Sequence, residues 1–377
     1  MELNDTGRCR HCLTAMGVVC ALGNGIEDVA RRMDANDASG MKRIEGLSGG
    51  ESTVFGFADG FPHPDTLAGS FAIPGGLPRV ASLVDAAMAQ ILDAVEAAAA
   101  EFGPSRIGAV VGTSNSTMEE FTEKPDTIDM SYPARRLKER WGVCGPCWSV
   151  STACSSSAKV FASARRLLDG GICDAVVVGG ADAFTRTVVE GFHALGALSP
   201  GLARPLAPDR DGINLGEGAA FFLMRRGGNP NGESPSVELL GVGESSDAYH
   251  MTAPDPDGRG AEAAMRMALE DAGLPARAID FVNLHGTGTR QNDDMECKAV
   301  RRVFGGAEPQ PDESPAAGLA VKAFSTKGLT GHCLGAAGAV EAALCWIQLS
   351  RSPATCLSNS FAFGGSNASI VLTSRNI

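Results

Sequence analysis

The sequence predicts an α/β protein whose two similar halves stack as alternating layers of helices and sheets. Apolar runs alternate with amphipathic segments along most of the chain, as expected when strands feed crossover helices. The same order of elements starts again after a polar, glycine-rich segment at residues 226–232, which indicates an internal duplication. The 47 glycines and the aromatic content of 6% suit closely packed, covered sheets. We assign residues 1–228 to the first half and 233–377 to the second; one long doubly wound sheet is the alternative.

In the first half, apolar runs predict strands at 13–22, 107–113, 148–152, 175–182 and 216–225. Apolar residues at helical spacing predict helices at 26–33, 81–102 and 155–168. Residues 41–80 are rich in glycine and proline, which predicts loops and short edge strands.

In the second half, the same reasoning predicts strands at 237–243, 281–284, 319–324 and 368–373. Helices are expected at 261–272, 295–304 and 336–349.

Composition narrows the class of protein. The formal net charge of −12 speaks against nucleic acid as a partner. The 11 cysteines have no framework spacing and the chain starts without an apolar leader, so we expect reduced thiols and a cytoplasmic protein. No apolar run is long enough for a membrane span.

Two short clusters of metal-ligating or basic residues could form binding sites. Residues 9–12 read Cys-Arg-His-Cys, but no second pair completes four ligands, so no metal site is expected. The basic cluster at 135–140 could bind an acidic partner, although a solvated helix face is the favoured interpretation.

Cys154 stands where an expected strand turns into an expected helix, among small residues that leave room for a substrate. The free N–H groups and the dipole at a helix N-terminus favour a thiolate, the form that attacks carbonyl groups. A nucleophile is therefore one interpretation, and a buried structural cysteine is the other.

Three further stretches place reactive groups at strand ends, where open α/β sheets bind ligands. His285 precedes a loop with two threonines, and Lys327 and His332 share a loop that leads to Glu341. Residues 359–367 form a glycine turn whose N–H groups could stabilise an oxyanion. Each stretch also has a structural reading: core histidines, an ion pair or a tight turn. Together they supply a complete set of groups for acyl transfer.

These stretches jointly resemble one family. Thr152 to Ser156, His285 to Thr289, Lys327 to Gly338 and Asn359 to Asn367 look like the motifs of elongating β-ketoacyl-acyl-carrier-protein synthases, condensing enzymes of the thiolase superfamily. The likeness covers nearly the whole chain in order. It implies a thiolase-like fold with a layered α-β-α-β-α architecture and a Cys-His-His site.

The resemblance also implies roles for particular residues. Cys154 would take the acyl group, and His285 and His332 would bind the malonyl thioester and stabilise the enolate formed on loss of CO2. Lys327 with Glu341 would fix the field around the histidines, and Phe363 would gate the site and share an oxyanion hole with Cys154. The remaining assignments are phosphopantetheine binding by Thr287 and Thr289, and organisation of the site by Asp293 and Glu296.

A finer likeness points to the ketosynthases of aryl polyene clusters, through residues 241–251, 283–285 and 358–365. Asn115 stands where fatty-acid synthases place an apolar or very small residue in the acyl pocket. A buried amide suits a polar or aryl-capped chain better than an alkyl tail. Two departures stand out: Ala362 replaces a glycine beside the gate, and the connection at 350–355 is short, through a deletion or through residues missing from the sequence.

The resemblance further implies partners and leaves alternatives. We expect an acyl carrier protein that delivers the phosphopantetheine arm, no other cofactor, and a homodimer or a heterodimer with a chain-length factor through residues 147–151. Arg204 and Arg135 are the candidate carrier-protein contacts. The alternatives are a non-condensing chain-length-factor-like subunit, which would lack the nucleophile, and a hydrolase that uses Cys154 with one histidine.

Overall fold

The computed structural model describes residues 10–67, 77–118, 128–227 and 237–374. Its strands are β1 (His11–Cys20), β2 (Gly23–Asn24), β3 (Met41–Glu45), β4 (Ser52–Gly56), β5 (Ile107–Gly112), β6 (Cys147–Val150), β7 (Ala175–Asp182), β8 (Leu215–Gly216), β9 (Gly218–Arg226), β10 (Val237–Ser246), β11 (Phe281–Asn283), β12 (Lys322–Phe324), β13 (Thr355–Phe361) and β14 (Ser366–Ser374). Its α-helices are α1 (Ile26–Asp34), α2 (Arg79–Ala89), α3 (Leu92–Phe102), α4 (Tyr132–Arg140), α5 (Ser156–Asp169), α6 (Arg186–Ala194), α7 (Arg259–Ala272), α8 (Arg290–Phe304), α9 (Lys327–Thr330) and α10 (Ala337–Arg351).

Two sets of strands repeat one topology. The first set is ordered β6-β5-β7-β9-β1 and the second β12-β11-β13-β14-β10. In each set the first three strands are parallel, and the remaining pairings are antiparallel. Numbered by their order along the chain, the strands of both sets have the same arrangement, which supports the duplication inferred from the sequence. The expected boundary between the halves falls at residues 228–233, which lie outside the described residues.

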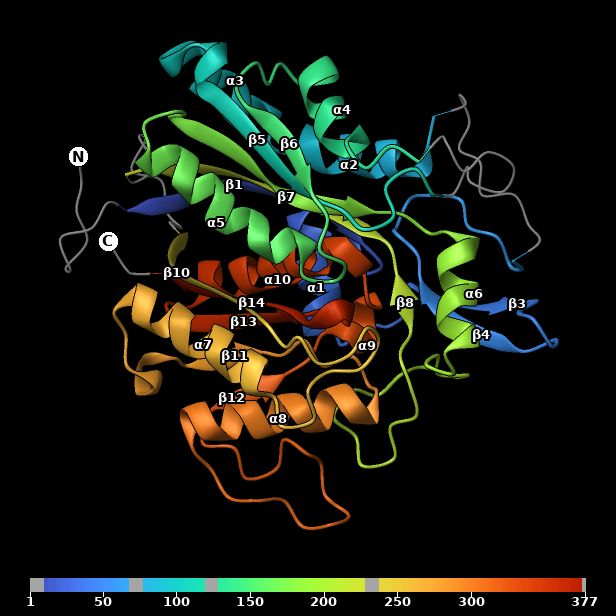
Figure 1. Ribbon diagram of the computed structural model, residues 1–377. Coiled ribbons are helices and arrows are strands. Elements are labelled where there is room, and N and C mark those ends of the chain that lie inside the picture. Colours follow the sequence, from blue (N-terminus) through green and yellow to red (C-terminus); the bar gives the residue numbers. More distant parts are fainter. Residues whose placement is uncertain (1–9, 68–76, 119–127, 228–236, 375–377) are drawn as a thin grey trace.

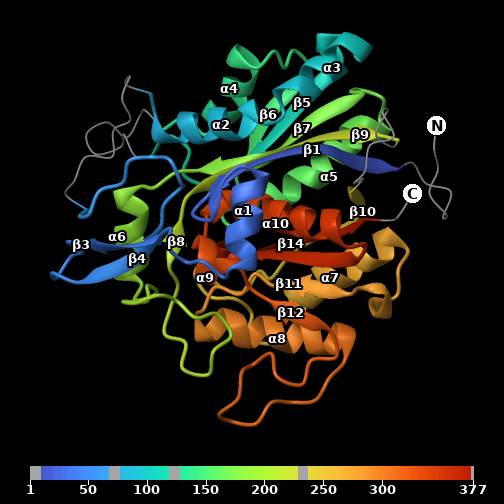
Figure 2. The ribbon, with the colours of Figure 1, turned by 180° about the vertical axis from the view of Figure 1, so that it is seen from behind.

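The two sets meet at one corner. Strands β1 and β10 pair only through Cys12 with Glu238 and Leu13 with Val237, which links all these strands in one hydrogen-bonded path. Elsewhere the sets diverge and enclose helices between them (Figures 1 and 2). The hydrogen bonding is therefore continuous, as in the single-sheet alternative, but the packing is that of two layers.

Helices separate and cover the two sheets, which confirms the predicted α-β-α-β-α architecture. Helices α5 and α10 lie between the sheets, where the largest apolar cluster includes Phe161, Phe222 and Leu372 (Figure 1). Helices α2, α3 and α4 cover the outer face of the first sheet, and α7 and α8 cover that of the second. The central helices are apolar on most sides because both sheets bury them.

Some expected elements differ in the structure. The helix predicted over 81–102 is two helices, α2 and α3, because the Gln90 side chain leaves the helical path to bond β1. Its Oε1 accepts from the N–H of Val18 at 3.0 Å, and its Nε2 donates to the Val18 carbonyl at 3.1 Å. Helix α8 starts at Arg290, five residues before the predicted start, and β12 covers only the end of the segment predicted as a strand.

The short connection after α10 closes without strain. Residues 352–354 join α10 to β13, the Ser352 N–H donates to the Gln348 carbonyl at 3.1 Å, and the Ser374 N–H donates to the Ala354 carbonyl at 3.0 Å. Backbone hydrogen bonds therefore hold both ends of this short connection, although it departs from the family pattern.

Candidate active site

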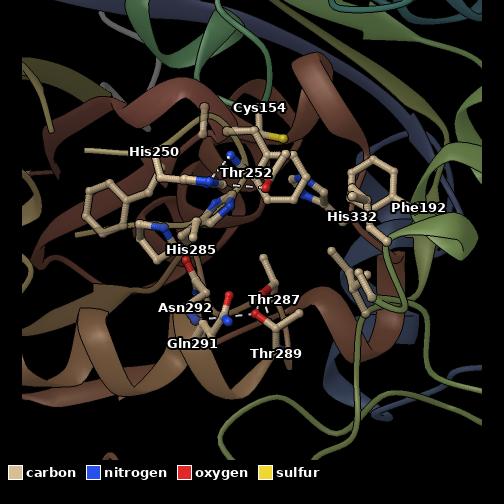
Figure 3. Close-up of a pocket in the computed structure, with 18 of the residues that line it drawn as sticks. Cys154, Phe192, His250, Thr252, His285, Thr287, Thr289, Gln291, Asn292 and His332 are labelled. Carbon is tan, nitrogen blue, oxygen red and sulfur yellow. Dashed lines mark hydrogen bonds between the residues drawn. The ribbon is translucent and has the colours of Figure 1, made fainter. Parts of the chain in front are cut away.

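Three loops that follow parallel strands bring the predicted reactive residues together. Cys154 follows β6, His285 follows β11, and His332 follows β12 and α9. In Figure 3, Cys154, His285 and His332 lie around one side of a cavity, with Thr287, Thr289, Gln291 and Asn292 across from them. The cavity holds about 350 Å³, within the range of small-molecule sites. Its other lining residues are Phe192, Leu195, Ala197, Ile213, Asp247, His250, Thr252, Ala253, Pro254, Phe361, Ala362, Phe363 and Asn367.

The turn that carries Cys154 is tight and locally strained. Ala153 has φ of 51°, a left-handed conformation that non-glycine residues rarely adopt and that marks many functional sites. The Ser156 hydroxyl donates to the Ala153 carbonyl at 2.5 Å and accepts from the Thr152 N–H at 2.8 Å. These bonds hold the backbone of the Cys154 turn against the strain.

Burial opposes the helix N-terminus that was expected to favour a thiolate at Cys154. Helix α5 begins at Ser156, and Cys154 is buried one residue before the N-cap. That burial raises the pKa of Cys154 to about 12, although the nearby charge of Lys327 lowers it. At neutral pH the resting side chain is therefore a thiol, and its reaction requires a base.

The two histidines are suited to receive that proton. Burial lowers the pKa of both imidazoles well below the usual value, and the charge of Lys327 lowers it further. The rings are 5.1 Å apart between centroids and nearly perpendicular. Each buried Nδ1 lacks a hydrogen-bond partner among the described residues. Both rings are thus neutral at pH 7, and each can act as a base at one nitrogen and as a donor at the other.

Behind the histidines lies a buried ion pair. The Lys327 ammonium bonds the Glu341 carboxylate and donates to the His285 carbonyl oxygen at 2.5 Å. Burial raises the pKa of Glu341 to about 7, against the lowering effect of Lys327. The pair is a core feature rather than the surface ion pair considered as the alternative, and it fixes the loop of His285 against α10.

A second buried carboxylate organises the same loop. Glu296 accepts from the backbone N–H groups of His285 and Gly286 at 2.8 Å each, and from the Asn359 amide at 3.0 Å. Burial raises the pKa of Glu296 to about 7. Asp293, one turn earlier on α8, also holds this loop in place. It accepts from the Gly288 N–H at 3.2 Å and from the Leu206 N–H at 2.9 Å.

Phe363 lies at the cavity mouth on the glycine turn after β13. Its ring stacks on Phe192 of α6, with centroids 5.4 Å apart and planes 20° apart. The turn is tied to the end of β10, since the Asn367 amide donates to Asp247 at 2.7 Å and the Gly364 N–H donates to the Met251 carbonyl at 2.8 Å. In the described chain, the backbone N–H groups of Cys154 and Phe363 donate to no other protein group.

Besides the buried Lys327, Glu341, Asp293 and Glu296, three predicted residues do not line this cavity. Asn115 is buried but does not belong to the cavity lining. Its side-chain amide N–H donates to the Ala183 carbonyl at 2.8 Å, and its Oδ1 has no partner among the described residues. Arg204 pairs with Asp209, and Arg135 pairs with Asp129 and Glu139. The basic cluster on α4 is therefore largely neutralised, as the helix-face interpretation expected.

The structure adds lining residues that the sequence reasoning did not select. Phe192 lies on α6, an element that was not predicted, although Val188, Val189, Phe192 and Leu195 have helical spacing. His250 lies in the stretch 241–251, which carried part of the family likeness, and Thr252 follows that stretch. The Thr252 N–H donates to His250 Nδ1 at 3.1 Å.

The described residues contain no cluster of side chains suited to a metal ion. Cys9 lies outside them, and His11 Nε2 contacts Asp169 at 2.7 Å. Across the same described part of the chain, the helices are too short or too polar to cross a membrane.

A thiol facing two neutral imidazoles, in a thiolase-like fold, defines a condensing acyltransferase. The comparisons agree. The N-terminal domain of beta-ketoacyl synthases matches residues 12–228, and their C-terminal domain matches residues 237–356. The chain belongs to the β-ketoacyl synthase family, which confirms the resemblance found in the sequence.

Individual relatives span most of the chain. Nodulation protein E of a Rhizobium species is 30% identical over 356 residues, covering 89% of this chain and 85% of that protein. The 3-oxoacyl-[acyl-carrier-protein] synthase 2 of Vibrio cholerae is 31% identical, with 96% and 98% covered. The solved ketosynthase ApeO of Xenorhabdus doucetiae, in complex with its chain length factor ApeC, is 36% identical with a TM-score of 0.83 and full coverage of both chains.

Proposed function

We propose that this β-ketoacyl synthase elongates an acyl chain on an acyl carrier protein by decarboxylative condensation, with Cys154 as the nucleophile. The observation that carries the proposal is the single cavity that Cys154, His285 and His332 share. The thiol argues against a non-condensing chain-length-factor-like subunit, which would lack it.

The first half-reaction is acyl transfer. A neutral histidine takes the Cys154 proton, and the thiolate attacks the carbonyl of the acyl thioester. The free N–H groups of Cys154 and Phe363 are placed to oppose the charge on the tetrahedral oxygen. Collapse of that intermediate breaks the old C–S bond, releases the phosphopantetheine thiol, and leaves the acyl group on Cys154.

The second half-reaction forms the carbon–carbon bond. The malonyl thioester loses CO2, and the electron pair of the broken bond delocalises onto the thioester oxygen as an enolate. N–H donors on His285 and His332 stabilise that oxygen. The enolate carbon attacks the acyl-Cys154 carbonyl, and the Cys154 sulfur leaves to give the β-ketoacyl thioester.

The surrounding residues act by position. Lys327 and Glu296 hold the His285 loop through the bonds described above. Glu341 is the ion-pair partner of Lys327. Asp293 accepts from the Gly288 N–H on the same loop. Thr287 and Thr289, whose hydroxyls are 3.0 Å apart, face the route of the phosphopantetheine arm and would hydrogen-bond its amides. No further cofactor is needed in this scheme.

For the substrate we propose an unsaturated, aryl-headed chain. The motif likeness of residues 241–251, 283–285 and 358–365 to aryl polyene ketosynthases supports this. Asn115, which the sequence nominated for the acyl pocket, does not line the cavity and lends no support. Faster acylation of the wild-type protein by a saturated donor than by an aryl-headed polyene donor would contradict the idea.

For the assembly we propose a dimer through the edge strand β6, with a chain-length-factor-like partner as the first candidate. The complex of ApeO with its chain length factor supports this choice. For the location we propose the reducing cytoplasm, which the free thiols of Cys20, Cys154 and Cys333 support. Mass measurement of the chain mixed with its genomic neighbours would separate a homodimer from a heterodimer.

The decisive experiment is trapping of the acyl group. Intact-protein mass spectrometry after incubation with acyl carrier protein should show one acyl group on Cys154, and none on Cys154→Ala. Addition of malonyl carrier protein should remove the label and yield a β-ketoacyl product. Release of free acid without malonyl substrate would instead indicate the hydrolase alternative.

A further inference from the structure

One fully buried carboxylate takes no part in either half-reaction. Asp182 ends β7, and its side chain is buried. Its oxygens accept from the Thr113 hydroxyl at 2.6 Å, from the Ser114 hydroxyl at 2.8 Å and from the Gly335 N–H at 2.6 Å. The backbone N–H groups of Ser114, at 2.9 Å, and of Asn115, at 3.0 Å, also donate to it. All these partners are neutral, so no counter-ion explains why a carboxylate is buried here.

The groups around Asp182 favour its charged form. Burial raises the pKa of this carboxyl, and its hydrogen bonds lower it. The Thr113 hydroxyl accepts from the Ser116 N–H at 3.1 Å, and the Ser114 hydroxyl accepts from the Gly335 N–H at 3.0 Å. Both hydroxyls can therefore donate their own hydrogens to the carboxylate. Oxygens that receive only donors are best satisfied when the carboxyl group is ionised.

The Gly335 N–H belongs to the turn that follows His332. Leu334 in this turn has φ of 53°, a left-handed conformation that costs energy in a non-glycine residue. The Leu334 side chain belongs to a buried apolar cluster with Phe184 of the first half. A Cβ on Gly335 would lie 2.6 Å from an Asp182 oxygen, so this turn and the carboxylate are packed without room for a side chain between them.

The first half of the chain also holds the backbone of His332 itself. The His332 N–H donates to the Asn214 carbonyl at 2.8 Å, and the His332 carbonyl accepts from the Gly216 N–H at 2.9 Å. His285, by contrast, is held by residues of the second half, as described above. The two imidazoles are thus anchored on different halves, and the bond to Asp182 is one of those that fix their relative position.

The charge of Asp182 also reaches the nucleophile. Burial is the main cause of the raised pKa of Cys154, and the charge of Asp182 raises it further. A negative charge there disfavours the thiolate, so a carboxylate brings no electrostatic benefit to activation of the thiol. Its benefit must lie in the hydrogen bonds that it accepts.

We propose that Asp182 is a positioning residue for the condensation step: by accepting the Gly335 N–H, it fixes the turn of His332 to the first half of the chain, at some cost to activation of Cys154. This inference rests on the proposed function, because His332 must meet the thioester oxygen of the malonyl donor. An amide cannot replace the carboxylate, since its NH2 group would face backbone N–H groups that also donate.

The test follows the two half-reactions in Asp182→Asn and in Ser114→Ala. Asp182→Asn removes the charge and turns one acceptor into a donor. Ser114→Ala keeps the charge but removes the hydroxyl that donates to Asp182 and accepts from the Gly335 N–H. Glu238→Gln is the matched control, because this buried carboxylate lies at the start of β10, whereas the cavity residue Asp247 follows the end of that strand.

In Asp182→Asn, decarboxylation of malonyl carrier protein should slow by about tenfold to a hundredfold, because a misplaced His332 no longer stabilises the enolate. Acylation of Cys154 should not slow and should accelerate by up to about threefold, because loss of the nearby charge lowers the pKa of the thiol while His285 can still take the proton. Ser114→Ala should slow decarboxylation by about threefold to tenfold and leave acylation within about twofold. Glu238→Gln should change neither rate.

The opposite responses of the two half-reactions distinguish positioning from general damage. Equal slowing of both half-reactions would overturn the proposal, because a disordered site would lose both. Unchanged decarboxylation in Ser114→Ala would also overturn it, even if Asp182→Asn fails to fold. Failure of the wild-type Cys154 to take an acyl group from the carrier protein would refute the proposed function, and the role of Asp182 with it.

Discussion

Replacement of Lys327 by methionine should make the stability of the fold depend on pH. Lys327 and Glu341 are both buried, and the ammonium is the partner of the carboxylate as well as a donor to the His285 carbonyl at 2.5 Å. Methionine fills a similar volume but leaves the Glu341 charge without a counter-ion. The loss of a partner from a buried ion pair costs about 3–5 kcal/mol when the remaining group stays charged.

The pKa of Glu341 sets the pH window. Burial raises this pKa from 4.5 to about 7 even with Lys327 present, which corresponds to about 3 kcal/mol against the charged form. A raised carboxyl pKa gives stability that is complete below 4.5 and lost as pH rises through the folded-state value. Without Lys327 that value rises further, so the variant should lose more stability than the wild type as the solution becomes alkaline.

Urea unfolding at pH 5.5 and pH 8.5 measures the effect. Lys327→Met should lower the free energy of unfolding by about 3–5 kcal/mol at pH 8.5 and by clearly less at pH 5.5. The double variant with Glu341→Gln should recover most of the loss at pH 8.5. A loss of equal size at both pH values, or a double variant no more stable than Lys327→Met, would refute the reasoning.

Three other outcomes are expected. Alkylation of Cys154 by iodoacetamide should accelerate up to pH 9 because burial raises the pKa of the thiol to about 12, and a plateau below pH 7.5 would contradict this. Gly286→Ala should lose about 1–3 kcal/mol of stability in thermal unfolding, since φ is +38° and a Cβ would lie 2.6 Å from Ser325 Cβ; an unchanged melting temperature would oppose it. Phe192→Ala removes the ring stacked on Phe363, worth about 0.5–1.5 kcal/mol, so CO2 release from malonyl carrier protein without an acyl donor should increase, and an unchanged rate would argue against the gate.

Much of the fold follows from local sequence pattern. The strands near residues 11–20, 107–112 and 175–182 are continuous apolar runs because both faces of each sheet are covered, and burial on both faces leaves a clear signal. The repeated order of elements also identified the duplication. What the pattern could not give was the edge contact between β1 and β10, because that contact depends on two residue pairs far apart in the chain.

The errors at helix boundaries have a tertiary origin. The segment 81–102 is apolar at helical spacing throughout, so its local sequence does not predict a break in the helix. The break occurs because the Gln90 amide binds both backbone groups of Val18, which lies 72 residues earlier. The start of α8 was missed for a different reason, because its first turn is polar and carries no apolar period.

The site was predicted by residue type but not by electrostatics. The family motifs selected Cys154, His285 and His332, which share the cavity. The expected acidity of a carrier protein selected Arg204 and Arg135, which do not line it. The charge state of Cys154 could not be read from its place before a helix, because burial in the assembled site outweighs the helix end. Desolvation is set by the whole fold, and a single sequence does not display it.

Lys327 acts on the condensation step more than on activation of the nucleophile. Its charge lowers the pKa of Cys154 and of both histidines, so its effects on proton transfer from thiol to imidazole largely cancel. No such cancellation applies to the enolate, because loss of CO2 moves the negative charge of the malonyl carboxylate onto the thioester oxygen beside His285 and His332. Lys327→Met should therefore slow decarboxylation of malonyl carrier protein much more than acylation of Cys154, by about tenfold or more in their ratio. Rapid-quench measurement of the two half-reactions gives that ratio, and equal slowing of both would show that Lys327 serves the thiol after all.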